Sequence, residues 1–213
     1  MSINTQNIID SVMNNLELIN ADDIPAIDLY MDQVTTFMEK HLNSSKRYDN
    51  DKILTKTMIN NYAKNNLLPS PEKKRYSKEH VLILVFIYYF KNVMSINDIK
   101  TLLNPICDRY FHKDSGITLE EIYKEVCGIE KDTIIELKKD LQDKSKLSKS
   151  IFKDSPAGEQ DFLQLFSLIC ALSYDVYVKK QLIETIIDSI AEENAPADDS
   201  KKEKKKKAES KED

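Results

Sequence analysis

Apolar and polar residues alternate with the period of an α-helix along most of this 213-residue chain. Between residues 3 and 20, and again between residues 27 and 42, apolar side chains recur every three or four positions, which places them on one face of a helix. The sequence Asp22-Asp23-Ile24-Pro25 separates the two segments. The chain therefore begins with two predicted amphipathic helices, and residues 43–52 after them are predicted to form a polar loop.

The middle of the chain has a different pattern. Residues 55–65 predict a helix with only one narrow apolar stripe, so most of its surface should face outward. Two prolines, Pro69 and Pro71, follow and forbid continuation of this helix. A basic tip, Glu72–Tyr76, comes next. Residues 81–90 are ten consecutive apolar residues, which predict a helix over residues 77–92 that is buried on all sides.

Capping boxes at residues 95–98 and 118–121 predict the starts of two further helices. Pro105 is expected to end the first of these helices, and Gly128 is expected to interrupt the second. Residues 106–113 are predicted to add one or two helical turns.

The last helix is predicted to have Pro156 in its first turn, and its apolar stripe continues over residues 162–192. Unbroken from Pro156 to Glu192, this helix would extend about 55 Å at 1.5 Å per residue. Either it breaks near Ser173 or it packs against a second subunit, and packing within one chain remains an alternative to a dimer. Residues 195–213 are rich in lysine and acidic residues, so we expect a disordered tail.

Composition is that of a globular helical protein, with 41% apolar and 31% charged residues and only three glycines. The net charge is −5, but the segment from Lys46 to His80 has nine basic and four acidic residues, which leaves the rest of the chain at −10. A local basic surface on an acidic body suits a single DNA-facing side, because phosphate attraction depends on local charge. The alternative is that these lysines only solvate a surface.

Other classes of protein are disfavoured. The N-terminus lacks the features of a signal peptide, and the longest apolar run is far short of the ~20 residues of a membrane span, so we expect a cytoplasmic protein without a membrane partner. Three widely separated cysteines do not suggest disulfides, and Cys107 and Cys127 are expected to be buried small residues rather than metal ligands. Without a glycine-rich phosphate loop, a nucleophile elbow or HExxH, neither an enzyme nor a cofactor or metal site is expected.

The predicted DNA contacts come from the polar helix and the basic tip. Lys56 and Lys64 are expected to meet phosphates, while Asn60 and Asn61 can reach base edges, since asparagine pairs with adenine through two hydrogen bonds. The complete predicted set is Lys56, Thr57, Asn60, Asn61, Lys64, Lys73, Lys74, Arg75 and Tyr76. Tyr62 and Tyr76 are expected to be packing residues whose hydroxyls reach phosphate. The competing interpretation is an ordinary solvent-exposed helix followed by a surface turn.

The order of these residues resembles the MerR-type winged helix-turn-helix. In that family a recognition helix ends in a tyrosine, and a Gly-Leu-Leu-x-Pro turn, a basic wing and two more helices follow; the matching positions here are Tyr62, Asn66–Pro69, Arg75-Tyr76 and Ser95–Ile99. Leu29–Phe37 and Leu54–Tyr62 (LYMDQVTTF and LTKTMINNY) also resemble an uncharacterised bacterial family of unknown function that is itself MerR-like. This sequence departs from the MerR pattern at Asn60, where arginine is usual, and in a shorter wing without glycine.

The resulting prediction is a mainly α fold: a MerR-like winged helix-turn-helix with a small basic wing, followed by a C-terminal helical region. We expect an N-terminal helix in residues 1–25, the DNA-binding domain in 26–104, a helical dimerisation or effector region in 105–194 and a tail in 195–213. The predicted function is a DNA-binding transcriptional regulator that binds double-stranded DNA as a homodimer, which is the assembly that the MerR resemblance implies; whether a small-molecule effector binds is left open. The alternative is a non-catalytic helical protein-interaction module that keeps the fold without binding DNA.

Overall fold

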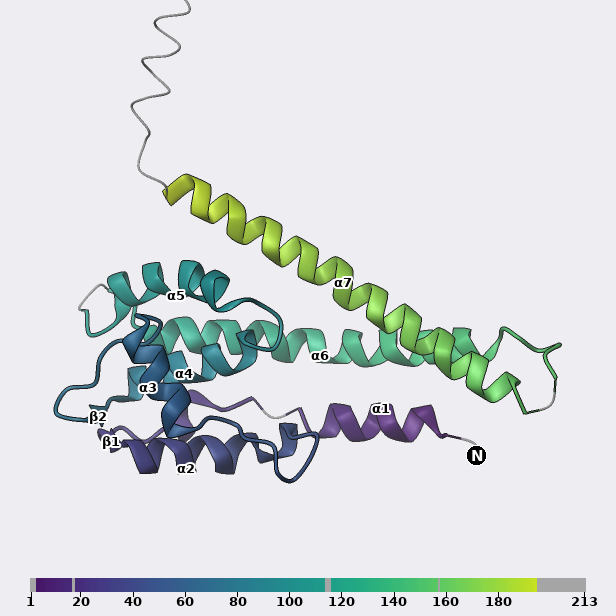
Figure 1. Cartoon of the computed structure of the whole chain (residues 1–213), viewed down its shortest axis with the longest axis horizontal. Coiled ribbons are helices and arrows are strands. Elements are labelled where there is room, and N and C mark those ends of the chain that lie inside the picture. The colour runs from purple at the N-terminus through teal and green to yellow at the C-terminus, as the bar shows by residue number, and fades with distance from the viewer. Residues whose placement is uncertain (1–2, 17, 114–115, 157, 195–213) are drawn as a thin grey trace, which may run out of the picture.

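The computed structural model describes residues 3–16, 18–113, 116–156 and 158–194, without the side chains of residues 130–132. The described chain is mainly α-helical, as predicted, with a single two-stranded sheet among these residues. Figure 1 shows a cluster of short helices at one end of the molecule, and two long helices, α6 and α7, that extend from it. The predicted tail, residues 195–213, lies outside the described residues.

The N-terminal helices are shorter than their apolar patterns predicted. Helix α1 covers Thr5–Asn14 and α2 covers Met31–Leu42, while Ala21–Asp23 forms one turn of 3₁₀ helix between them. Helix α2 starts late because Leu29–Tyr30 forms strand β1, whose backbone pairs with a strand far along the chain. Another 3₁₀ turn, Asn43–Ser45, begins the predicted polar loop.

The central elements match their prediction closely. Helix α3 covers Lys56–Lys64, strand β2 covers Arg75–Tyr76 and α4 covers Lys78–Phe90. Thr55 caps α3 by accepting a 3.1 Å hydrogen bond from the Met58 amide. Every residue of α4 from His80 to Tyr88 is buried, so α4 is the central element of the core, as its unbroken apolar run requires.

Helix α5 covers Ile96–Tyr110 and contains Pro105, so the prediction that this proline ends the helix is wrong. Proline costs an interior helix one backbone hydrogen bond and a clash with the preceding turn. The helix nevertheless continues, and it packs apolar residues on both sides of the proline: Leu103 is buried, and Ile106 and Cys107 lie against the core. We infer that this packing offsets the cost of the proline.

Helices α6, Leu119–Lys149, and α7, Gln160–Asn194, are both continuous. Gly128 does not interrupt α6, which is consistent with the modest cost of about 1 kcal/mol for one glycine inside a long helix. Nor does α7 break near Ser173, and it begins four residues after Pro156, whose carbonyl instead accepts a turn hydrogen bond from the Glu159 amide.

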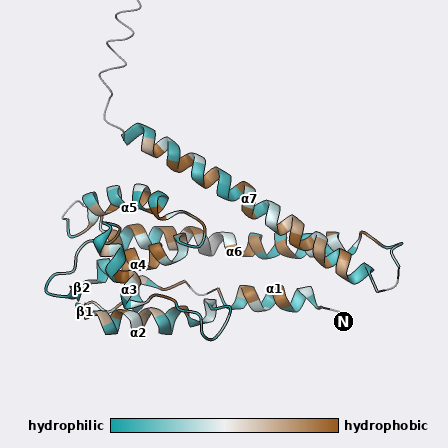
Figure 2. Ribbon diagram, in the orientation of Figure 1, coloured by the Kyte–Doolittle hydropathy of each residue, from teal (hydrophilic) through white to brown (hydrophobic). Residues whose placement is uncertain are grey.

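Helix α7 packs against α6 with its first half and against α5 with its second (Figure 1). Many of its apolar residues are exposed, and the ribbon of α7 is hydrophobic at many positions (Figure 2). Lys144 of α6 binds Asp175 at 2.8 Å, and Lys180 donates a 3.1 Å hydrogen bond to the Val93 carbonyl after α4. By length and composition alone, α7 is also long and apolar enough to cross a membrane, and one such helix is weak evidence for a span.

Two contacts fix the N-terminal segment against α6. Tyr123 donates a buried 2.6 Å hydrogen bond to the Ile19 carbonyl, and Lys124 binds Asp22 at 2.7 Å. Further along α6, Ser145 forms a buried 2.7 Å hydrogen bond with Thr5 at the start of α1. The first half of α6 therefore completes the short-helix cluster, whereas its second half forms a separate three-helix layer with α1 and α7.

Candidate nucleic-acid interface

Helix α3 presents one polar face to solvent. Ile59 and Tyr62 are buried, while the five polar residues predicted to contact DNA are all exposed: Lys56, Thr57, Asn60, Asn61 and Lys64. Their spacing of three and four residues places them side by side on one face. The structure therefore brings these predicted residues together on a surface that a duplex can approach.

The turn after α3 relies on Asn66 in a left-handed conformation, with φ of 55°. The amides of Leu67 and Leu68 both bond the Tyr62 carbonyl, at 2.9 and 3.2 Å, which reverses the chain and buries both leucines. The MerR-type pattern has glycine at this position, and asparagine is the best substitute because its short side chain tolerates positive φ. This departure from the pattern therefore preserves the turn.

The basic tip is a tight turn over Glu72–Arg75. The Arg75 amide bonds the Glu72 carbonyl at 2.8 Å, and both central residues have positive φ, 47° for Lys73 and 64° for Lys74. Positive φ at both central positions defines a type I′ turn, which normally takes glycine, asparagine or aspartate there. Two lysines in this conformation cost backbone energy, and such strain at exposed positions points to a role for the side chains.

Strand β2 follows this turn and pairs with β1, which directly precedes α2. Leu29 lies opposite Tyr76 and Tyr30 opposite Arg75 in an antiparallel pair. The Arg75 guanidinium carbon lies 5.8 Å from the centre of the Tyr30 ring, within the range of a cation–π contact. Sequence analysis missed Tyr30, since nothing local in the sequence indicates that residue 30 meets residue 75.

Tyr62 and Tyr76 both pack in the hydrophobic core. Their side chains are only 8% and 2% exposed, and burial raises the pKa of both phenols. The Tyr76 ring packs edge-on against His80 of α4, with ring centres 5.5 Å apart. Tyr76 therefore packs behind the turn, against α4.

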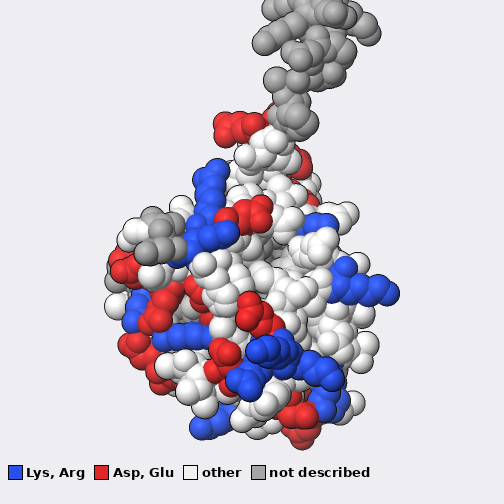
Figure 3. All heavy atoms as spheres, turned by 90° about the vertical axis from the view of Figure 1, so that its left-hand side faces the viewer, with Lys and Arg blue, Asp and Glu red and all other residues white. Residues whose placement is uncertain are grey.

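Ion pairs divide the basic residues into two groups. Lys56 binds Asp32 of α2, Lys46 binds Glu39, and Lys78 binds Glu120 of α6 at 2.7 Å. The other group has no ion pair to a described residue and is exposed: Arg47, Lys52, Lys64, Lys73, Lys74 and Arg75. Figure 3, which views the end of the molecule bearing the sheet and α3, shows basic and acidic side chains interspersed, so positive charge here is local rather than continuous.

The cysteines offer little chemistry. Burial, with Asp108 and Glu79 nearby, raises the pKa of the Cys107 thiol to about 11, so it is protonated and unreactive at neutral pH. Cys127 also packs at the edge of the core, whereas Cys170 is exposed on α7. Among the described residues, no group of three or more histidine, cysteine, aspartate or glutamate side chains is arranged to hold a metal ion.

These features define a class: a mainly α-helical domain in which a short polar helix, a strained basic turn and a small two-stranded sheet lie around one buried helix. Residues 19–126 match the model of a family described as a domain of unknown function, DUF1836, and because the match covers half of the chain, the chain belongs to this family. The matched region starts at Ile19 and ends just after its partner Tyr123, so it coincides with the short-helix cluster. No curated protein and no solved structure matches the chain.

Proposed function

We propose that this protein is a cytoplasmic, non-enzymatic DNA-binding transcriptional regulator of the MerR-like winged helix-turn-helix type. The observation that carries the proposal is the pairing, at one end of the molecule, of an exposed polar helix face with a basic turn (Figure 1). Helix α3 enters the major groove, where Asn60 and Asn61 meet base edges. Lys73, Lys74 and Arg75 bind the flanking backbone as the wing.

The strain at the tip of the wing supports this assignment. A turn selected only for stability would place glycine or asparagine where Lys73 and Lys74 stand. Arg75 is also held over the Tyr30 ring, which limits the rotamers that must be ordered on binding. Three cations concentrated on one rigid turn are suited to phosphate contacts, which position a protein on DNA without regard to sequence.

The active form is proposed to be a dimer through α7. Tyr174, Val178, Leu182 and Ile186 form a row at every fourth position, and their side chains are 68%, 46%, 60% and 50% exposed. Such a row on one helix face is a natural seam for a second helix. Covering it with the same row of a second copy creates a symmetric contact and fixes the spacing of two half-sites. Membrane association of α7 is the alternative, and a vesicle-flotation assay distinguishes it.

A second candidate is a helical protein-interaction module that does not bind DNA. The observation in its favour is the ion pair between Lys56 and Asp32, which neutralises a cation at the start of α3. The interspersed acidic residues on the same side of the molecule act in the same direction.

Fluorescence anisotropy with pooled fragments of the source genome tests the proposal at low and moderate salt. The wild type is compared with Lys73→Ala/Lys74→Ala/Arg75→Ala and with a matched variant, Lys139→Ala/Lys153→Ala/Lys179→Ala, whose exposed lysines lie away from α3 and the wing. We expect salt-sensitive binding by the wild type and the matched variant, and a loss of at least tenfold in affinity for the wing variant. A folded dimer that binds no DNA at low salt would exclude the proposal and favour the interaction module.

A further inference from the structure

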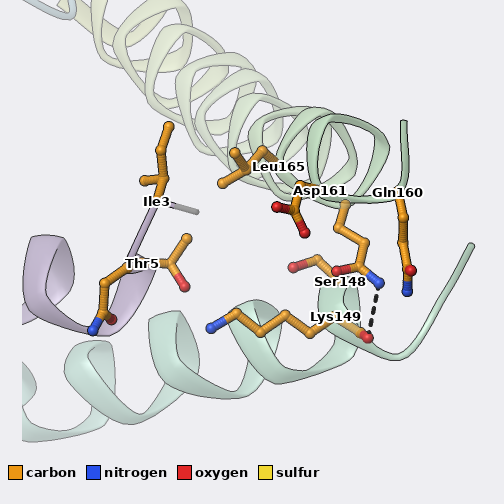
Figure 4. Close-up of a pocket in the computed structure, with 9 residues that line it drawn as sticks. Ile3, Thr5, Ser148, Lys149, Gln160, Asp161 and Leu165 are labelled. Atoms are coloured by element: carbon orange, nitrogen blue, oxygen red, sulfur yellow. Dashed lines mark hydrogen bonds between the residues drawn. The ribbon is translucent and has the colours of Figure 1, made fainter. Parts of the chain in front are cut away.

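The layer formed by α1, α6 and α7 has a two-part, partly open cavity far from the candidate nucleic-acid interface. One part is a slot of about 290 Å³ lined almost entirely by apolar groups, including Ile8 and Ile9 of α1, Leu141 of α6 and Leu172 of α7. The other part is a polar chamber of about 430 Å³ (Figure 4). Ile3, Thr5 and Leu165 line both parts, so the slot and the chamber are adjacent and share a wall.

Buried hydroxyl groups lie at the boundary of the two parts: Thr5 lines both, Ser148 lines the chamber, and Ser145 bonds Thr5 from behind. Thr5, Ser145 and Ser148 are 6%, 4% and 6% exposed. The Thr5 and Ser145 hydroxyls bond each other at 2.7 Å, and the Ser148 hydroxyl donates to the Ser145 carbonyl at 2.9 Å. Thr5 and Ser148 line the chamber, and a hydroxyl oxygen has a second lone pair, so both groups can still accept a hydrogen bond from a bound molecule.

The chamber contains one charge of each sign. Lys149 runs along its floor toward α1, and the Asp161 carboxylate projects into it from α7 (Figure 4). Gln164 fixes the backbone around Lys149, since its amide donates to the Lys149 and Ile151 carbonyls at 3.1 and 2.8 Å. Neither Lys149 nor Asp161 forms an ion pair with another described residue.

We propose that this cavity binds a single-chain zwitterionic amphiphile, with its aliphatic chain in the slot and its head group in the chamber. The wider volume lies at the head and the narrower one at the tail, as such a molecule requires. Lys149 faces the anionic group and Asp161 the cationic group, whereas a simple anion or cation would meet one repulsive charge. The aliphatic chain of the ligand supplies most of the affinity because it leaves water for an almost entirely apolar lining.

Isothermal titration of the full-length protein with octyl-, decyl- and dodecylphosphocholine, each below its critical micelle concentration, tests this site. Affinity should rise about three- to fourfold per methylene group while the chain still fits the slot, and then level off. Dodecanoate and dodecyltrimethylammonium, which carry only one of the two charges, should bind at least threefold more weakly than dodecylphosphocholine. No step of this test involves DNA, so its result is independent of the proposed function.

Variants locate the site. Ile8→Trp should fill the slot and abolish binding. Val12→Trp, one turn away on α1 and outside the lining, should leave binding unchanged. Ile8 and Val12 are 51% and 52% exposed, so neither change should prevent folding. Lys149→Ala should selectively weaken dodecanoate, and Asp161→Ala should selectively weaken dodecyltrimethylammonium, with Lys179→Ala as the control. Absence of saturable binding, binding equal in Ile8→Trp and Val12→Trp, or affinity indifferent to head-group charge would each overturn the proposal.

Discussion

Lys56, the first residue of α3, forms an ion pair with Asp32 in the first turn of α2. Both side chains are largely exposed, at 59% and 75%, so the pair adds little to stability. Its importance is functional, because it occupies a cation that the proposed DNA complex needs for phosphate. If the protein binds DNA as proposed, Asp32 competes with phosphate for Lys56.

Replacing Asp32 with asparagine should therefore strengthen DNA binding. We expect affinity at low salt to rise severalfold and the salt dependence to steepen by about 0.9 in slope, the value for one additional phosphate contact. Glu39→Gln is the matched control, since it removes the same charge and releases Lys46 instead. Equal gains in both variants would mean that only net charge matters.

The lysines of the type I′ turn should show opposite effects on stability and binding. Lys73→Asn/Lys74→Gly relieves positive φ at two positions and should raise the free energy of unfolding by about 1 kcal/mol per position. The same change should weaken DNA binding and reduce the salt slope by about 1.8 if each lysine contacts one phosphate. Urea unfolding and anisotropy on the same preparation measure both effects. Unchanged DNA affinity in the stabilised variant would remove these lysines from the interface.

Asn66 should tolerate glycine better than alanine. Its φ of 55° suits glycine, so Asn66→Gly should leave stability equal or higher, whereas Asn66→Ala should cost about 1 kcal/mol. At Asn60, inside α3, the order should reverse because alanine is the better helix former by about 1 kcal/mol. The four urea midpoints check this, and the same order at both sites would contradict the left-handed turn.

His80 should make the fold sensitive to mild acid. His80 is 2% exposed, and its Nε2 has no hydrogen-bond partner among the described residues. Burial, with a further contribution from the nearby His112, lowers its pKa from 6.5 to about 4. The Pro69–Ser70 backbone and Asp28 oppose this shift only in part. Between pH 6.5 and 4, His80 therefore binds a proton in the unfolded chain but remains neutral in the folded protein. The free energy of unfolding should fall by up to about 1.4 kcal/mol per pH unit between pH 6.5 and 4, and should be fully retained above this range.

Denaturant titrations across this pH range test the role of His80. His80→Gln should be less stable at neutral pH, since it loses ring packing, but its pH dependence should be shallower than that of the wild type. His41→Gln, which changes a partly exposed histidine away from His80, should keep the wild-type dependence of the free energy of unfolding on pH. Parallel pH profiles for the wild type and His80→Gln would assign the acid sensitivity to carboxylates instead.

The exposed row on α7 should control assembly. Val178→Glu/Leu182→Glu introduces charge at the centre of the proposed seam, so sedimentation velocity should show monomers where the wild type forms dimers. The control Lys179→Glu/Gln181→Glu alters exposed positions of the same helix outside the row and should still dimerise. A wild type that is monomeric at all concentrations would refute the seam.

Local sequence signals determined the helices and several of their ends. The ten-residue apolar run specified the buried α4, because no polar position in it could face water. Capping residues marked the starts of α3, α5 and α6, since side-chain oxygens there satisfy amides that have no partner within the helix. The exposed polar face of α3 likewise followed from its narrow apolar stripe. Periodicity and capping act within a few residues, so the sequence is sufficient to predict them.

Tertiary structure alone decided the features that join distant residues. Leu29 pairs with Tyr76, and this pairing shortened α2 and placed Tyr30 beside Arg75. The ion pair between Asp32 and Lys56 likewise joins α2 to α3. Helix α5 continued through Pro105 because packing on both sides outweighed a local rule. These outcomes depend on the free energy of contacts between segments remote in sequence, which no local pattern encodes.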